Sequence, residues 1–171
     1  MTDETPALPP VPIPADALPP EFWQGVEQFN QGEFYACHDS FEALWTEAHE
    51  PDRTFYQGLL QLAVGLYHLG NHNWQGAATL LGEAIGRLRP YDDNYGGIAL
   101  APLRAQAKVI WLLLHETGRD QVADLAQRLG LGVALQQTDP LVNPGQRVAL
   151  PRIIPRPDPS VVLGSGLLGW I

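Results

Sequence analysis

The chain has 171 residues, a formal net charge of −9 and one cysteine. A chain of this length suits one domain with a proper core, because it buries roughly two thirds of its unfolded surface. The acidic balance argues against nucleic acid as a partner. A lone cysteine excludes an internal disulfide, and we see neither a signal peptide nor a membrane span, so we expect a cytoplasmic protein.

Proline is concentrated at both ends of the chain. Residues 1–19 hold six prolines without helical periodicity, which indicates an extended Pro-rich arm, either free or docked on the domain. Residues 20–130 are predicted to form the helical domain. In residues 131–171, short apolar pieces alternate with proline and glycine. This pattern favours extended segments that pack on the bundle or on a partner over a sheet.

Apolar residues at steps of three and four predict six helices in the middle of the chain. They are expected at about 20–30, 33–48, 52–69, 74–89, 101–116 and 120–129, the last capped by Asp120. The third is apolar nearly all round and is placed at the centre, where Gly58 and Gly65 would let a neighbour approach closely. The predicted fold class is all-α: an antiparallel helical bundle of five or six helices built on helical hairpins, with extended Pro-rich ends.

The helix expected at 33–48 carries polar groups among aromatic rings. Its residues Phe34, His38, Phe41, Glu42 and Trp45 recur at helical spacing. A buried imidazole or carboxylate is costly without a partner. The pattern therefore predicts that His38 and Glu42 point inward and meet polar groups of the next helix.

The helix expected at 52–69 offers such partners. It should lie antiparallel to the preceding helix, because the connection between them is short. Glu42 would then lie near the level of Gln61, and His38 nearer to His68. Arg53 is expected at the edge of this polar seam as a counter-ion. The candidate ligand-binding residues are His38, Glu42, Arg53, Gln57, Gln61 and His68.

Two interpretations of the seam remain open. In the first, it is a closed hydrogen-bond network, in which Glu42 pairs with Arg53 or a ring N–H group. In the second, His38, Glu42 and His68 hold a divalent metal ion or a small ligand, with an open position for water. Its catalytic version is a metal-assisted hydrolase with Glu42 or Asp39 as the base. Further candidate ligands are Asp39, Gln61 and His72.

Simpler interpretations suit the other conspicuous residues. Trp45 and Trp74 are expected to be core aromatics. Cys37 is expected on another helix face than His38, and nothing around it suggests a thiol nucleophile. The acidic loop at 91–97 lacks the ordered ligands of a calcium site and is interpreted as a solvated turn.

A longer pattern joins the second and third predicted helices. It comprises Phe29-Asn30-x-Gly32-x-Phe34-Tyr35-x-x-His38-Asp39-x-x-Glu42-x-x-Trp45, then Arg53-x-Phe55-x-Gln57-Gly58-Leu59-x-Gln61-Leu62-Ala63, Tyr67-His68 and Gly76-Ala77. Over about residues 26–90 the chain resembles the domain of unknown function 309 family. The resemblance implies an all-helical fold without an established activity. It also implies signature positions at His38, Glu42, Trp45, Arg53, Gln57, Gly58 and His68. At Asp39 the family usually has a glutamate, which reaches further.

For the whole chain we expect a non-catalytic structural or protein-interaction module. The last residues of the apolar C-terminus are costly to expose, so we expect them to fill a groove on their own domain, with a second copy or another protein as the alternative partner. The alternative is the divalent-metal or small-ligand domain described above, and whether the chain is an enzyme stays open.

Overall fold

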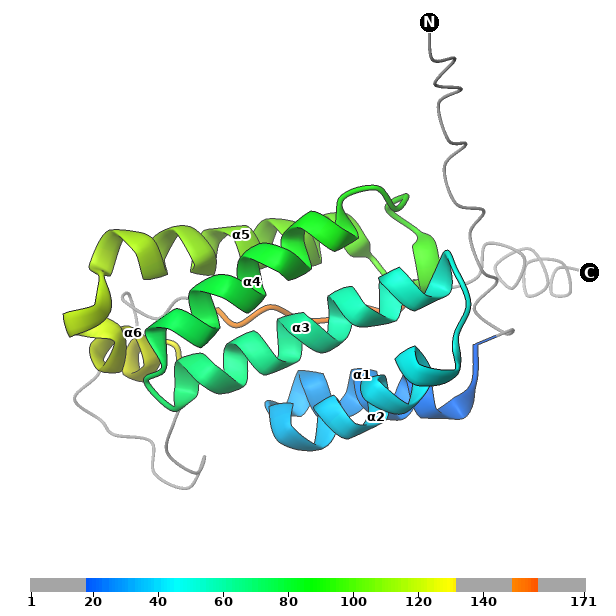
Figure 1. Ribbon diagram of the computed structural model, residues 1–171, viewed down its shortest axis with the longest axis horizontal. Helices are drawn as coiled ribbons and strands as arrows, with labels where there is room; N and C mark the ends of the chain where they lie inside the picture. Colours follow the sequence, from blue (N-terminus) through cyan, green and yellow to red (C-terminus); the bar gives the residue numbers. More distant parts are fainter. Residues whose placement is uncertain (1–17, 132–148, 157–171) are drawn as a thin grey trace, which may run out of the picture.

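The computed structural model describes residues 18–131 and 149–156, which contain six α-helices and no strand (Figure 1). The all-α prediction is confirmed, and every predicted helix is present with its ends shifted by at most two residues. The helices are α1 (Pro20–Gln31), α2 (Phe34–Glu47), α3 (Asp52–Gly70), α4 (Trp74–Leu88), α5 (Leu100–Thr117) and α6 (Val122–Arg128). Short 3-10 turns, η2 (Tyr95–Gly97) and η3 (Arg119–Gln121), flank α5.

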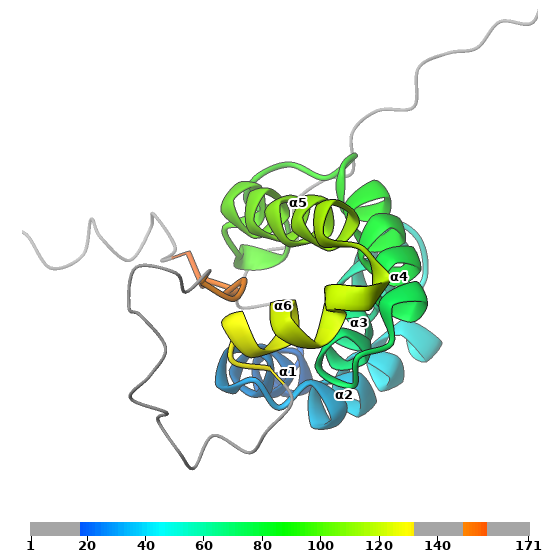
Figure 2. The same ribbon diagram turned by 90° about the vertical axis from the view of Figure 1, so that its left-hand side faces the viewer.

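The first five helices form an arc in which each packs against the next (Figure 2). Helix α6 contacts both α3 and α5. The extended segment 149–156 lies between α1 and α5, at the open side of the arc (Figure 2). Helix α3 is the most deeply buried helix, with eleven buried residues, as its apolar sequence predicts.

Local sequence explains most helix ends. Gly32 ends α1 in the left-handed region, at φ 79°, where glycine has no Cβ to clash. Asn73 caps α4, because its side-chain oxygen accepts a hydrogen bond from the Gly76 amide at 3.0 Å. The predicted cap at Asp120 is wrong. Asp120 lies inside the η3 turn, and α6 begins after it without a side-chain cap.

Helices α3 and α4 approach closely at the two predicted glycines. A Cβ atom at Gly58 would lie 2.7 Å from the side chain of Leu88. One at Gly65 would lie 2.9 Å from the side chain of Leu81 and 3.1 Å from its backbone nitrogen. Only glycine allows this spacing without displacing α4, so the prediction of a close crossing is confirmed.

The loop between α4 and α5 is anchored more firmly than a solvated turn. Its Tyr91 and Tyr95 are buried, and their hydroxyls donate hydrogen bonds to the Pro51 carbonyl at 2.6 Å and to Asp52 at 2.5 Å. The acidic side chains between them stay exposed, as predicted. Burial raises the pKa of Tyr91 to about 12. The two tyrosines therefore tie this loop to the start of α3.

Several predictions fall on residues outside the described ones. These are the Pro-rich arm and the apolar C-terminus expected to fill a groove on its own domain or to bind a partner. Within residues 18–131 and 149–156, no helix is long and apolar enough to cross a membrane.

Candidate functional site

Helix α2 is rotated relative to the prediction. Its buried stripe is Phe34, Cys37 and Phe41, at steps of three and four. Cys37 is fully buried whereas His38 is partly exposed, so the prediction that the two lie on different helix faces is confirmed, and burial raises the pKa of the Cys37 thiol. This stripe leaves the side chain of His38 33% exposed and that of Glu42 50% exposed. The predicted burial of the His38 and Glu42 seam is therefore wrong.

Three polar side chains gather on the outer face of α2. The His38 Nδ1 atom lies 3.0 Å from an Asp39 carboxylate oxygen, and its Nε2 atom lies 4.0 Å from Glu42. One ligand atom from each residue can be chosen so that all lie within 4.8 Å of one another. The carboxylates lie near different ring nitrogens, so an ion on the imidazole would have one of them close by. The second would need a side-chain rotation.

Gln61 faces α4 instead of α2. Its amide nitrogen donates to Glu83 at 2.5 Å, and its amide oxygen accepts from Arg87 at 2.8 Å. The Arg87 guanidinium lies 3.9 Å from the same Glu83 carboxylate. The result is a closed hydrogen-bond network between α3 and α4, which satisfies the one buried polar side chain of the described core.

The remaining predicted residues are separated from His38. The His68 ring lies 3.0 Å from the Asn73 amide nitrogen, at the turn before α4, and is not part of the α2 group. Arg53 lies over the Trp45 ring at 5.4 Å instead of pairing with Glu42. Gln57 is half-buried on α3. Another candidate, His72, is exposed in the turn at φ 59°.

Trp45 and Trp74 pack against the core while remaining partly buried. The Trp74 indole donates to the Leu114 carbonyl at 2.8 Å. The Trp45 indole nitrogen is buried without a hydrogen-bond partner among the described residues. Because Arg53 covers this ring, the outer edge of α2 has both an aromatic and a cationic component.

Two exposed tyrosines were missed by the sequence reasoning. Tyr35 on α2 is 66% exposed and Tyr67 on α3 is 40% exposed, with ring centroids 5.6 Å apart. Tyr35 also stacks beside His38, at 6.4 Å. The helical spacing of Tyr35, His38 and Glu42 was the available signal. We name this surface the α2–α3 face; its residues are Tyr35, His38, Asp39, Glu42 and Tyr67.

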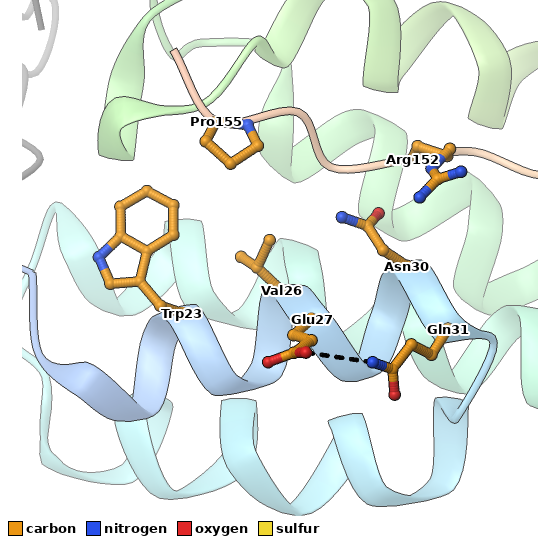
Figure 3. Close-up of a pocket in the computed structure, with 7 residues that line it drawn as sticks. All are labelled: Trp23, Val26, Glu27, Asn30, Gln31, Arg152 and Pro155. Atoms are coloured by element: carbon orange, nitrogen blue, oxygen red, sulfur yellow. Dashed lines mark hydrogen bonds between the residues drawn. The ribbon is translucent and has the colours of Figure 1, made fainter. Parts of the chain in front are cut away.

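A second feature lies on the side of α1 that faces the extended segment 149–156. A groove of about 340 Å³ runs between α1 and the extended segment, and none of the residues of the α2–α3 face lines it. Trp23 and Val26 of α1 face Pro155, and Arg152 lies further along near Asn30 and Gln31 (Figure 3). A hydrogen bond joins Glu27 to Gln31 at its edge (Figure 3).

Comparison with known proteins identifies the part of the chain that carries the α2–α3 face. Residues 22–80 match DUF309, a domain of unknown function. The resemblance predicted from the sequence is thereby confirmed. The DUF309 segment runs from α1 into α4 and contains the whole α2–α3 face. The other wall of the groove, residues 149–156, lies outside it.

An uncharacterized protein of Aquifex aeolicus (strain VF5) is similar to part of the chain. It is 31% identical over 78 residues, which make up 45% of this chain. The same residues are 23% of the relative, so the chain spans about a quarter of that protein.

Proposed function

We propose that the chain is a non-catalytic protein-interaction module and that its α2–α3 face binds a segment of a partner protein. The observation that carries this proposal is the pair of exposed tyrosine rings, Tyr35 and Tyr67, 5.6 Å apart. Tyrosine is enriched in protein interfaces because its large ring offers contact area at a low entropic cost. Both rings lie within the DUF309 segment.

The charges beside the rings select the chemistry of the partner. Asp39 and Glu42 are both exposed, at 70% and 50% of their side chains. A carboxylate pairs with arginine or lysine, and a tyrosine ring attracts the same cations through its face. A basic segment therefore fits this surface best. We place the interaction in the cytoplasm, in keeping with a lone cysteine that is buried.

Site-specific photo-crosslinking tests the proposal. A benzoylphenylalanine at position 35 or 67, in the full chain in its native cells, should give a discrete adduct with another protein. Position 112 is the matched control, because Leu112 on α5 is also exposed, at 49%. Adducts with the chain itself would identify a homo-oligomer. Equal adducts from positions 35 and 112, or none from 35 and 67, would contradict the proposal.

A second candidate is a divalent-metal site, favoured by the ligand atoms of His38, Asp39 and Glu42 within 4.8 Å. An imidazole with two carboxylates suits zinc, manganese or iron. We rank it below the interaction module because the two carboxylates lie near opposite ring nitrogens and are open to water.

Metal titration separates this candidate from the first. At 100 times its dissociation constant, an ion should stabilise the fold by about 2.7 kcal/mol, which thermal unfolding detects. His38→Gln should abolish the shift, whereas His72→Gln, which changes an exposed turn residue, should leave it. An unchanged melting temperature with zinc, manganese and iron would eliminate the metal site.

A further inference from the structure

The extended segment 149–156 is held mainly through its backbone. The Asn30 side chain donates to the Ile153 carbonyl and accepts from the Ile153 amide, both at 2.8 Å. Gln106 of α5 accepts from the Arg152 amide at 3.1 Å. Asn30 and Gln106 thus bind the main chain of the extended segment from its two sides, and these hydrogen bonds involve none of the segment's side chains.

The loop before α5 also forms backbone hydrogen bonds with the segment. The Ala99 amide donates to the Ile154 carbonyl, and the Arg156 amide donates to the Gly97 carbonyl, both at 2.8 Å. Ile98 and Pro155 form an antiparallel bridge. The segment therefore pairs with the loop through backbone hydrogen bonds, in the manner of a strand added to a sheet, which is a common way of binding an extended peptide.

Only a few side chains of the segment are buried against the domain. Ile153 is fully buried and Pro151 is buried, whereas Arg152, Ile154 and Arg156 are exposed. Beside them the groove stays open between Trp23, Val26 and Pro155 (Figure 3). The site thus buries an aliphatic anchor and the proline two residues before it, while Pro155 lines the groove beside Trp23.

We propose that the cleft between α1 and α5 is a peptide-docking groove for a partner protein, and that residues 149–156 are its internal occupant. The peptide that fits is extended, with an aliphatic anchor that follows a buried proline by two residues and precedes a second proline by two residues, as in the occupant. This groove is distinct from the α2–α3 face, and neither proposal depends on the other.

A partner peptide can occupy the groove only when the internal segment, residues 149–156, is displaced from it. This segment belongs to the same chain as the groove, so it competes with a free peptide at a high effective concentration. A free peptide of the same sequence should therefore bind weakly to the unmodified chain. It should bind strongly once the anchor of the internal segment is removed.

The experiment measures binding of a fluorescent peptide, Ala-Leu-Pro-Arg-Ile-Ile-Pro-Arg, to the full-length protein by anisotropy. In the Ile153→Asp variant the internal anchor cannot be buried, so we expect the peptide to bind at least about tenfold more tightly than to the unmodified chain. A peptide with aspartate at the anchor should not bind. Adding Asn30→Ala to the variant should reduce binding at least about tenfold, because both backbone hydrogen bonds are lost.

A folded Ile153→Asp variant that binds no better than the unmodified chain would overturn the proposal. Should that variant not fold, hydrogen exchange on the unmodified chain decides. Millimolar peptide should speed exchange of the chain's own Ile153 amide, and an unchanged rate overturns the proposal. A dimer of the unmodified chain that Ile153→Asp abolishes would also overturn the assignment, since the occupant would then be a second copy.

Discussion

Helix α3 packs between α4 and α2. Its polar contacts are buried on the side toward α4 and exposed on the side toward α2. Toward α4, glycines bring the helices close, and Gln61 is buried in a closed network with Glu83 and Arg87. Toward α2, the polar and aromatic groups lie at the surface, and His38 has its charged neighbours on its own helix. The first side buries its polar group in hydrogen bonds, whereas the second leaves polar side chains and rings exposed to solvent.

The largest expected effect concerns the α3–α4 contact. Leu81 is fully buried against Gly65, so Leu81→Ala should lower the free energy of unfolding by about 2–5 kcal/mol. Leu112→Ala on the exposed side of α5 should change it by less than about 0.5 kcal/mol. Urea unfolding measures both. Equal effects would mean that α4 is not packed on α3 in this way.

Gln61 tests the closed network. Gln61→Leu should destabilise the fold by about 1–3 kcal/mol, toward the lower end because Glu83 and Arg87 keep some contact with water. Gln57→Leu is the matched control on the same helix. A larger loss from the control than from Gln61→Leu would contradict the network.

High pH should weaken the aromatic end of α3. Burial raises the pKa of Tyr56 and of Tyr91 to about 12, from an ordinary value of 10.0. Their contribution is complete below pH 10 and is lost as the pH rises toward 12, because the unfolded chain ionises first. In that window, each tyrosine should lower the free energy of unfolding by up to about 1.4 kcal/mol per pH unit. The free energy of unfolding, measured from pH 9 to 11, should fall less steeply in Tyr91→Phe than in the unmodified chain. An identical slope in the two proteins would contradict the prediction.

The outer edge of α2 should contribute less. Arg53→Ala removes the cation above Trp45 and should cost about 0.5–1 kcal/mol. Tryptophan fluorescence should report greater access of iodide to the ring. A loss of several kcal/mol would contradict a contribution limited to the cation–π contact with Trp45.

The exposed groups of the α2–α3 face should contribute least to stability. Tyr35→Ser and Glu42→Gln should each change the free energy of unfolding by less than about 0.5 kcal/mol. Thermal and urea unfolding check this. A larger loss would show that the face is structural and not available for binding.

Local patterns were enough to predict the helices and the glycine crossing. They did not decide the rotation of α2, because Phe34 and Phe41 fit a stripe through Cys37 as well as one through His38. Three-dimensional packing chooses Cys37, whose small apolar side chain is cheaper to bury than an imidazole.

Long-range partners explain the other errors. Gln61 was assigned to α2 because nothing local indicated that Glu83 and Arg87, one turn apart on α4, would face it. The Asn30 clamp on Ile153 joins residues 123 positions apart, a distance over which periodicity carries no information.

The most direct test of the account compares two charge-matched variants in the crosslinking experiment at position 67. Asp39→Asn with Glu42→Gln removes two charges from the α2–α3 face, and Asp120→Asn with Asp124→Asn removes two exposed charges around α6. The account predicts that the adduct is lost in the first variant and retained in the second. Equal yields from both variants would contradict it.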